Sequence, residues 1–134
     1  MKKIKNRNRI CKVLAKSIVI LILTFSNNLF AGILIFVSHS MNDEALKAYF
    51  KEAQLNGGTL VMRGLINNSF SKTKAKCEEL KIAYDINPIL FNDFKIEVVP
   101  VIIEQKGEIV KKITGHISLI EALKIFHEES NDKI

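Results

Sequence analysis

From residue 33 onward, apolar and polar positions fall into blocks that predict strands and helices. The uncharged apolar runs at 33–37 and 59–62 have the length of strands that are buried on both faces. Between them, residues 42–55 carry apolar side chains three and four positions apart, which is typical of a helix with one buried face. This pattern predicts a parallel strand–helix–strand unit, whose functional residues lie at the carboxyl ends of the strands, here residues 38–41.

Residue types that cap helices mark where the next elements begin. Ser40 with Asp43 three residues later forms a capping box, which predicts that Ser40 caps the first helix. Asn68 or Ser69 is expected to cap a second helix that runs to about Tyr84. The apolar stripe of this second helix would consist of Phe70, Cys77, Leu80 and Tyr84.

The remaining segment predicts a short helix, a hairpin and a final helix. Residues 85–88 are expected to turn the chain into a short helix that is capped by Asn87. Pro100 interrupts the apolar run 96–103, and a proline is tolerated there as the first residue of a strand. A Lys-Gly turn then leads into an antiparallel strand, and Ser118 caps the last helix. The predicted order is β-α-β-α-(short α)-β-β-α, an α/β fold with one central mixed sheet.

Charge is unevenly distributed along the chain. The formal net charge is +6, but seven of the 20 basic residues precede residue 31, and no acidic residue precedes Asp43. The rest of the chain carries 13 basic and 14 acidic residues, so it lacks the positive excess that nucleic-acid binding requires. No nucleic-acid partner is therefore expected.

The basic N-terminus has the pattern of an export signal. A positively charged region precedes an apolar stretch at 17–25, and small residues follow it. The apolar stretch is shorter than the ~20 residues of a transmembrane helix, although an uncleaved anchor remains the alternative. The sequence thus predicts a signal peptide or membrane anchor at 1–31, a periplasmic domain at 32–130 and a tail at 131–134.

The stretch from 94 to 118 resembles the carboxyl half of thioredoxins: an apolar strand after a proline, a Lys-Gly turn, a second strand, a glycine and a last helix. The resemblance implies a thioredoxin-like fold in which Pro100 takes the place of a proline that is cis and faces the CxxC cysteines. Residues 38–44 contain no cysteine, whereas thiol exchange needs a thiolate and a second thiol. Disulfide exchange is therefore not expected, and Cys77 is the one cysteine beyond the signal segment.

Several short motifs together resemble the F-type conjugative pilus assembly family TrbC. The resemblance covers residues 33–125 and implies a periplasmic protein of a type IV secretion apparatus that helps to assemble the conjugative pilus. It also implies partnership with the assembly protein TraW. The motifs are Val-Ser-x-Ser-Met at 37–41, Gly-Gly-Thr-Leu-Val at 57–61, Arg-Gly-Leu at 63–65, Asn-Asn-Ser at 67–69, Pro-x-Leu-Phe at 88–91 and Val-Pro at 99–100.

Other chemistries find little support in the residue pattern. His39 lies between Ser38 and Ser40, but neighbours at a strand end point to opposite sides. We therefore expect a surface histidine rather than a base for a serine nucleophile. The three histidines and Cys77 match no metal-ligand spacing. The sequence thus predicts no enzymatic activity, no cofactor, no metal and no small-molecule substrate.

The predicted function is a non-enzymatic assembly factor that binds other transfer proteins in the groove where thioredoxins hold extended polypeptide. Asn67 and Asn68 either cap the second helix or shape a partner surface. The alternative is a thiol-linked redox protein or chaperone that acts through Cys77 with a partner. The candidate partner-binding residues are Ser40, Met41, Asn67, Asn68, Val99 and Pro100.

Overall fold

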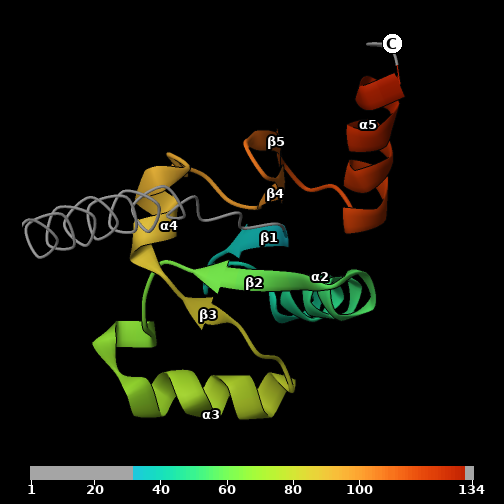
Figure 1. Ribbon diagram of the computed structural model, residues 1–134. Helices are drawn as coiled ribbons and strands as arrows, with labels where there is room; N and C mark the ends of the chain where they lie inside the picture. The colour runs from blue at the N-terminus through green and yellow to red at the C-terminus, as the bar shows by residue number, and fades with distance from the viewer. Residues whose placement is uncertain (1–31, 132–134) are drawn as a thin grey trace, which may run out of the picture.

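The computed structural model describes residues 32–131, so the predicted signal segment at 1–31 and residues 132–134 lie outside the described range. Its centre is a five-stranded sheet with the strand order β3-β2-β1-β4-β5 (Figure 1). No helix within the described range is long and apolar enough to cross a membrane. The strands are β1 (Gly32–Val37), β2 (Gly58–Met62), β3 (Asp85–Ile86), β4 (Val101–Lys106) and β5 (Ile109–Thr114). The helices are α2 (Asp43–Asn56), the 3-10 turn η1 (Ile66–Asn68), α3 (Phe70–Leu80), α4 (Pro88–Asp93) and α5 (Leu119–Asn131).

The sheet is mixed because β1 pairs with strands of both directions. It runs parallel to β2 and antiparallel to β4, while β5 pairs antiparallel with β4. This arrangement confirms the predicted α/β class and the central mixed sheet. The prediction of a plain turn at 85–88 is wrong, because the structure adds β3 there as a short parallel neighbour of β2. Two register pairs are enough for this edge strand, with Val61 opposite Asp85 and Met62 opposite Ile86.

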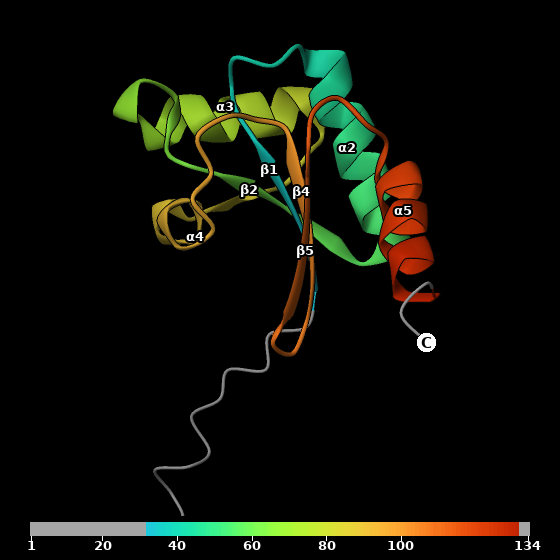
Figure 2. The same cartoon turned by 90° about the horizontal axis from the view of Figure 1, so that it is seen from above.

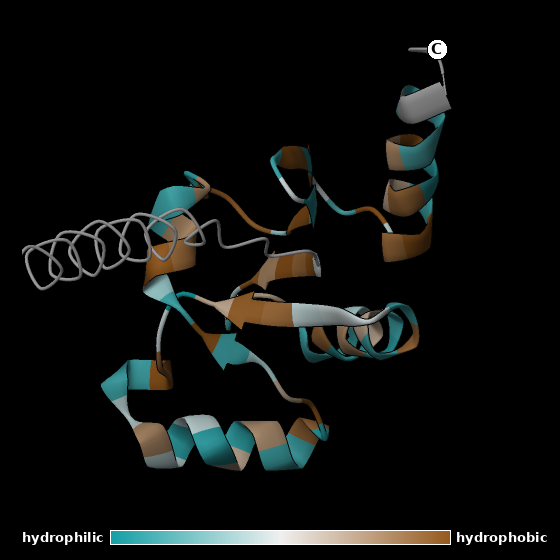
Figure 3. Ribbon diagram, viewed as in Figure 1, coloured by the Kyte–Doolittle hydropathy of each residue, from teal (hydrophilic) through white to brown (hydrophobic). Residues whose placement is uncertain are grey.

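Helices cover both faces of the sheet. α2 and α5 lie on one side and α4 lies on the other (Figure 2). Because side chains alternate along a strand, Ile35 and Val37 belong to the core under α2 and α5. Leu34 and Phe36 belong to the core under α4. In Figure 3, β1 and most of β2 are hydrophobic, whereas α3 carries many hydrophilic residues. The uninterrupted apolar sequence of β1 thus reflects burial on both faces.

The first helix is capped by Asn42, so the prediction that Ser40 caps it is wrong. The Asn42 side-chain oxygen accepts a hydrogen bond from the backbone N–H of Ala45 at 2.7 Å, and its backbone is extended. Asparagine is as good a cap as serine, and it stands two residues closer to the helix. The Ser40 hydroxyl instead lies 3.0 Å from the hydroxyl of Ser38. The loop after β1 is therefore two residues longer than the capping box predicts.

The second helix begins as predicted and ends earlier. Ser69 caps it, since its hydroxyl accepts from the N–H of Lys72 at 3.3 Å. The helix stops at Leu80 because Lys81 adopts a left-handed conformation with φ 56° and donates its N–H to a carbonyl of the last turn. Phe70 was expected on the apolar stripe but is 71% exposed, and Thr73 is buried instead. The contact of α3 with the apolar core thus depends on Leu80 at its carboxyl end.

The hairpin of β4 and β5 begins directly after Pro100, as the sequence predicts. The Val99–Pro100 peptide bond is cis, as the resemblance to thioredoxins implies. The backbone carbonyl of Pro100 accepts a hydrogen bond from the N–H of Gly115 at 3.0 Å. This bond closes the open end of the hairpin and holds the entry to β4 beside the end of β5.

The amino end of α5 is fixed by two side chains of α2. A carboxylate oxygen of Glu52 accepts from the backbone N–H of Leu119 at 2.5 Å, and the Tyr49 hydroxyl donates to the carbonyl of Ile117 at 3.0 Å. Ser118 caps the same helix end by accepting from the N–H of Glu121. A carboxylate at this position also interacts favourably with the positive end of the helix dipole. The two helices on this face are therefore joined by polar contacts as well as by the core.

We predict that Glu52→Ala lowers the free energy of unfolding by about 1–2 kcal/mol, because it leaves a helix N-terminal N–H without its charged acceptor. Gln54→Ala, at an exposed position of the same helix, should change it by less than about 0.5 kcal/mol. Urea unfolding of the two variants and of the wild type measures both changes in the free energy of unfolding. Equal effects would mean that Glu52 contributes nothing to the docking of α5.

Candidate functional site

One edge of the sheet gathers the loops that carry the candidate residues. Val37 and Met62 are register partners, so the parallel strands β1 and β2 end side by side. β4 runs the other way and starts at the same edge, where Val101 lies opposite Phe36. The loops after β1 and β2 and the segment before β4 therefore meet there. We call this the carboxyl edge, and all six predicted partner-binding residues lie in these segments.

A cleft of about 370 Å³ opens at the carboxyl edge. It lies between the end of β1, the end of β2, the helix α4 and the segment that leads into β4. Its lining is mostly apolar, with one cation and one carboxylate among the side chains. We call it the edge cleft, and its lining residues are Val37, Ser38, His39, Met62, Arg63, Gly64, Leu65, Phe91, Ile96, Glu97 and Val99.

Arg63 stands at the cleft in a fixed position. Its guanidinium carbon lies 4.9 Å from the centre of the Phe91 ring, and its Nη2 donates to the carbonyl of Ile96 at 2.5 Å. The Phe91 ring is itself held in the core, edge to face with Phe36 at 4.9 Å. Arg63 is exposed apart from these contacts. The edge cleft thus carries a preorganised cation whose other N–H groups can bind a carboxylate or a backbone carbonyl.

His39 is half-buried, so the prediction of a surface histidine is wrong. Its Nε2 lies 3.2 Å from the backbone oxygen of Gly64, and a carbonyl only accepts, so Nε2 carries the proton at this contact. The imidazole packs edge to face against Tyr84, with 5.5 Å between the ring centres. The hydroxyls of Ser38 and Ser40 meet each other. These contacts connect the loops after β1 and β2, and they do not join a base to a nucleophile.

The six predicted residues occupy different positions at the carboxyl edge. Val99 lines the edge cleft. Met41 is half-buried and packs against the core under α2, and Pro100 is buried. Ser40 is exposed in the turn before α2. The structure therefore brings Val99 to the cleft, whereas Met41 and Pro100 lie outside its lining.

Asn67 and Asn68 are exposed on η1, with φ of 48° and 54°. Neither residue caps α3, since Ser69 does so. Asparagine tolerates the left-handed region better than most residues, which explains its presence at both positions. The alternative that remains for them is the partner surface.

The sequence alone did not single out Arg63, Phe91 or Glu97. Arg63 offered a signal, because it is the first polar residue after an apolar strand that predicts the carboxyl end of a parallel pair. Phe91 and Glu97 follow a separate turn, and only the folded chain places them beside that edge. Among residues 32–131, no group of three or more His, Cys, Asp or Glu side chains is placed to hold a metal ion.

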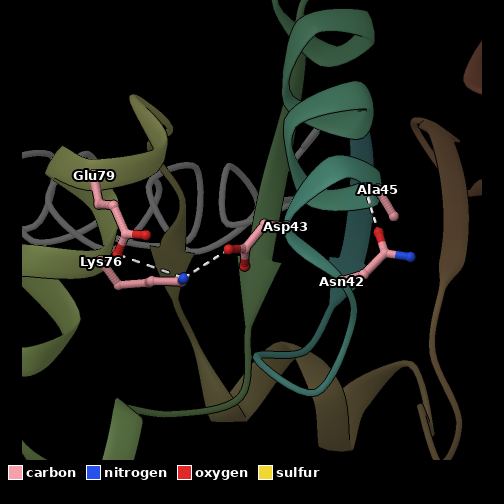
Figure 4. Close-up of polar contacts among 5 residues, drawn as sticks. All are labelled: Asn42, Asp43, Ala45, Lys76 and Glu79. Atoms are coloured by element: carbon pink, nitrogen blue, oxygen red, sulfur yellow. Dashed lines mark hydrogen bonds and ion pairs between the residues drawn. The ribbon is translucent and has the colours of Figure 1, made fainter.

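An ion pair connects α3 to the start of α2. The Nζ of Lys76 lies 2.8 Å from a carboxylate oxygen of Asp43 and 3.5 Å from one of Glu79 (Figure 4). The hydrogen bond to Asp43 is the main cause that raises the pKa of Lys76 above its ordinary value. Figure 4 also shows the cap of α2, from Asn42 to Ala45, beside this pair. The position of α3 thus depends in part on a polar contact with the first turn of α2.

The sequence profile of the type-F conjugative transfer system pilin assembly proteins, TrbC, matches residues 35–126. This chain belongs to that family. The resemblance predicted from the short motifs is therefore confirmed, and so is a role in assembly of the conjugative pilus. The matched segment includes every residue that lines the edge cleft of this TrbC-family protein. No curated protein and no solved structure matches the chain.

We predict that Asp43→Asn lowers the pKa of Lys76 toward its ordinary value of 10.5, because it removes the main hydrogen-bonding partner. Lys76 has a higher pKa in the folded state, so its contribution to stability is present below pH 10.5 and is lost as pH rises through the raised value. Stability of the variant should therefore be lower at neutral pH and should fall less above pH 10.5. NMR titration of the Lys76 side chain measures the change in its pKa. Urea unfolding at neutral pH and above pH 10.5 measures the change in stability.

Glu44→Gln is the matched control, since Glu44 is exposed in the same first turn of α2. It removes a similar interaction with the helix dipole and should leave the pKa of Lys76 unchanged. A pKa of Lys76 that does not move in Asp43→Asn would contradict the assigned cause.

Proposed function

We propose that this TrbC-family protein is a non-enzymatic, periplasmic assembly factor that binds another transfer protein, of the TraW type, at the carboxyl edge. Membership in a pilin assembly family supports the assembly role. The edge cleft, with its apolar lining and fixed cation, supports binding of a polypeptide. The basic and apolar pattern of residues 1–31 supports export, and those residues lie outside the described range.

We also propose that the domain is thioredoxin-like. Two parallel strands joined by a helix, followed by an antiparallel hairpin that starts at Pro100, support this assignment. The loop after β1 holds serines and a histidine where thioredoxins carry cysteines. Without a thiol at this position the protein cannot exchange disulfides there, whereas the shape of the groove does not require one. Binding in the absence of catalysis is the function that this combination favours.

The proposal depends most on the unpaired backbone and exposed side chains of the segment before β4. None of the backbone–backbone hydrogen bonds of the described loops involves Val98 or Val99. Val98 is 62% exposed, and Ile89 of the adjacent α4 region is 66% exposed. Free backbone groups beside apolar side chains are what an extended peptide uses when it adds as a strand. We therefore place the partner's extended segment along residues 97–99, with the edge cleft receiving one of its side chains.

We predict that Val98→Asp reduces both capture of the partner and conjugative transfer about tenfold, the effect of losing about 1.4 kcal/mol of binding. The matched control is Ile109→Asp, because Ile109 is 64% exposed as the first residue of β5, at the opposite edge of the sheet. Crosslinking and pull-down from pilus-producing cells, with counts of pili and of transconjugants, compare the two variants. Both should fold as the wild type does, since both positions are already exposed.

Loss of transfer in Ile109→Asp with normal transfer in Val98→Asp would mean that the partner site lies away from the carboxyl edge. Equal losses in both variants would mean that a charge at any exposed apolar position disturbs assembly, and the assignment of the cleft would fail.

The thiol-linked alternative makes a different prediction. Cys77 is half-buried near the carboxyl end of α3, and a thiol there lacks the helix N-terminus that activates cysteines. We predict that Cys77→Ser keeps pilus assembly and transfer within about twofold of the wild type, under reducing and oxidising growth alike. A redox-dependent loss of transfer, measured in the same mating assay, would restore the alternative.

A further inference from the structure

Arg63 keeps unused hydrogen-bond donors at the edge cleft. It is the only arginine among residues 32–131, it lines the cleft and it is exposed. Its Nη2 donates to the carbonyl of Ile96, and its guanidinium lies against the Phe91 ring. A guanidinium has more N–H donors than this one, and within residues 32–131 no ion pair involves Arg63. The cation is therefore held in place while most of its donors stay available.

The charged groups around Arg63 do not neutralise it. Glu97 also lines the edge cleft, but it forms no ion pair with Arg63 in the described part of the chain. Lys112 reaches the same segment, because its Nζ lies 3.4 Å from the backbone carbonyl of Lys95. The positive charges of Lys95 and Lys112 are matched by the negative charges of Asp93 and Glu97. The charge of Arg63 is thus in excess at this edge of the sheet.

A carboxylate fits these free donors better than a neutral acceptor does. A guanidinium binds both oxygens of a carboxylate in one plane, and such a charge-assisted bond is roughly twice as strong as a bond to a neutral carbonyl. The contacts of Arg63 with Phe91 and Ile96 already restrict its side chain, so little further entropy is lost on binding. The apolar lining of the cleft limits competition from water on that side.

The segment before β4 fixes where the acid of a bound strand would lie. Val98 and Val99 make none of the backbone–backbone hydrogen bonds of the described loops, so a partner strand can pair with them. Ile96 is different, because it is 2% exposed, its carbonyl accepts from Arg63 and its N–H donates to the carbonyl of Phe91 at 2.8 Å. Strand pairing therefore ends at residue 97. The partner residues just beyond that point pass Arg63.

We propose that Arg63 binds an Asp or Glu side chain of the partner's extended segment, just beyond the residues that pair along 97–99. An apolar side chain of the same segment enters the edge cleft. A side chain can supply the carboxylate without requiring that the partner chain end at this point. The inference rests on the proposed function, since it names the chemistry of the segment that occupies the carboxyl edge.

The test uses purified full-length protein and N-acetylated, C-amidated hexapeptides of valine and threonine with one leucine, a composition that favours an extended backbone. The peptides differ at one position, which holds glutamate, glutamine or lysine. We expect the glutamate peptide to shift the NMR signals of the Val98 and Val99 amides and of the Arg63 side chain. It should bind about fivefold more tightly than the glutamine peptide, and the lysine peptide should bind most weakly. Raising the salt concentration from about 0.1 M to about 1 M should reduce this preference.

Variants of Arg63 assign the preference to its side chain. Arg63→Gln should bind the glutamate and glutamine peptides equally, and its affinity for the glutamine peptide shows whether the site is intact. Arg63→Lys keeps the charge but loses the planar pair of donors, so part of the preference should remain. This variant decides the question if Arg63→Gln does not fold, because an unchanged preference in Arg63→Lys would overturn the inference. The matched control is Lys51→Gln, which removes an exposed positive charge from α2 and should leave the preference at its full value.

The possible failures are distinct from one another. If the wild type binds the glutamate and glutamine peptides equally, with shifts at Val98 and Val99, the inference is wrong and the proposed partner site stands. A preference that survives in Arg63→Gln would also overturn it, because another group would then recognise the acid. A glutamine peptide with a free C-terminal carboxylate that binds more tightly than the glutamate peptide would refute the side-chain source. If no peptide shifts the signals of Val98 and Val99, the proposed site and this inference both fail.

Discussion

The central position of β1, buried on both faces and paired with strands of both directions, is the constraint on which the rest of the structure depends. Parallel pairing with β2 brings the loops after both strands to one edge, and antiparallel pairing with β4 brings the start of that strand to the same edge. Because both faces of β1 are apolar, helices must cover both sides. The edge cleft is therefore a consequence of strand directions, and its position does not depend on any single loop sequence.

The two helices that contact α2 differ in how they are held. On one face, α5 is fixed to α2 by Glu52 and Tyr49 in addition to the core. α3 contributes few buried residues and is joined to α2 by the exposed or half-exposed groups of Lys76 and Asp43. A hollow of about 240 Å³ lies between α3, α2 and β2, where α3 has few buried side chains. Polar contacts and core contacts thus both hold α5, whereas α3 depends on fewer buried side chains.

The sequence predicted the sheet and most helix ends, because burial periodicity and capping residues are local signals. It misplaced the cap of α2, since Ser40 and Asn42 are equally suitable residue types and only backbone geometry chooses between them. It missed β3, whose residues are exposed and have no apolar pattern. At the candidate site it indicated the correct edge, but Arg63 and Phe91 meet through contacts between segments far apart in the chain. Such contacts leave no periodic signal in one sequence.

The loop after β1 is ordered by its own hydrogen bonds, and it contains no thiol. The N–H of Met41 donates to the carbonyl of Ser38 at 3.1 Å, and the N–H of Ser40 donates to the Ser38 hydroxyl at 3.2 Å. His39 adds a bond to Gly64, so the loop is tied to the neighbouring strand end as well. A loop ordered by its own hydrogen bonds loses little entropy when a partner binds, and preorganisation of this kind favours affinity. If the domain is thioredoxin-like, as we propose, these serines and the histidine order the loop at the position where thioredoxins carry their cysteines.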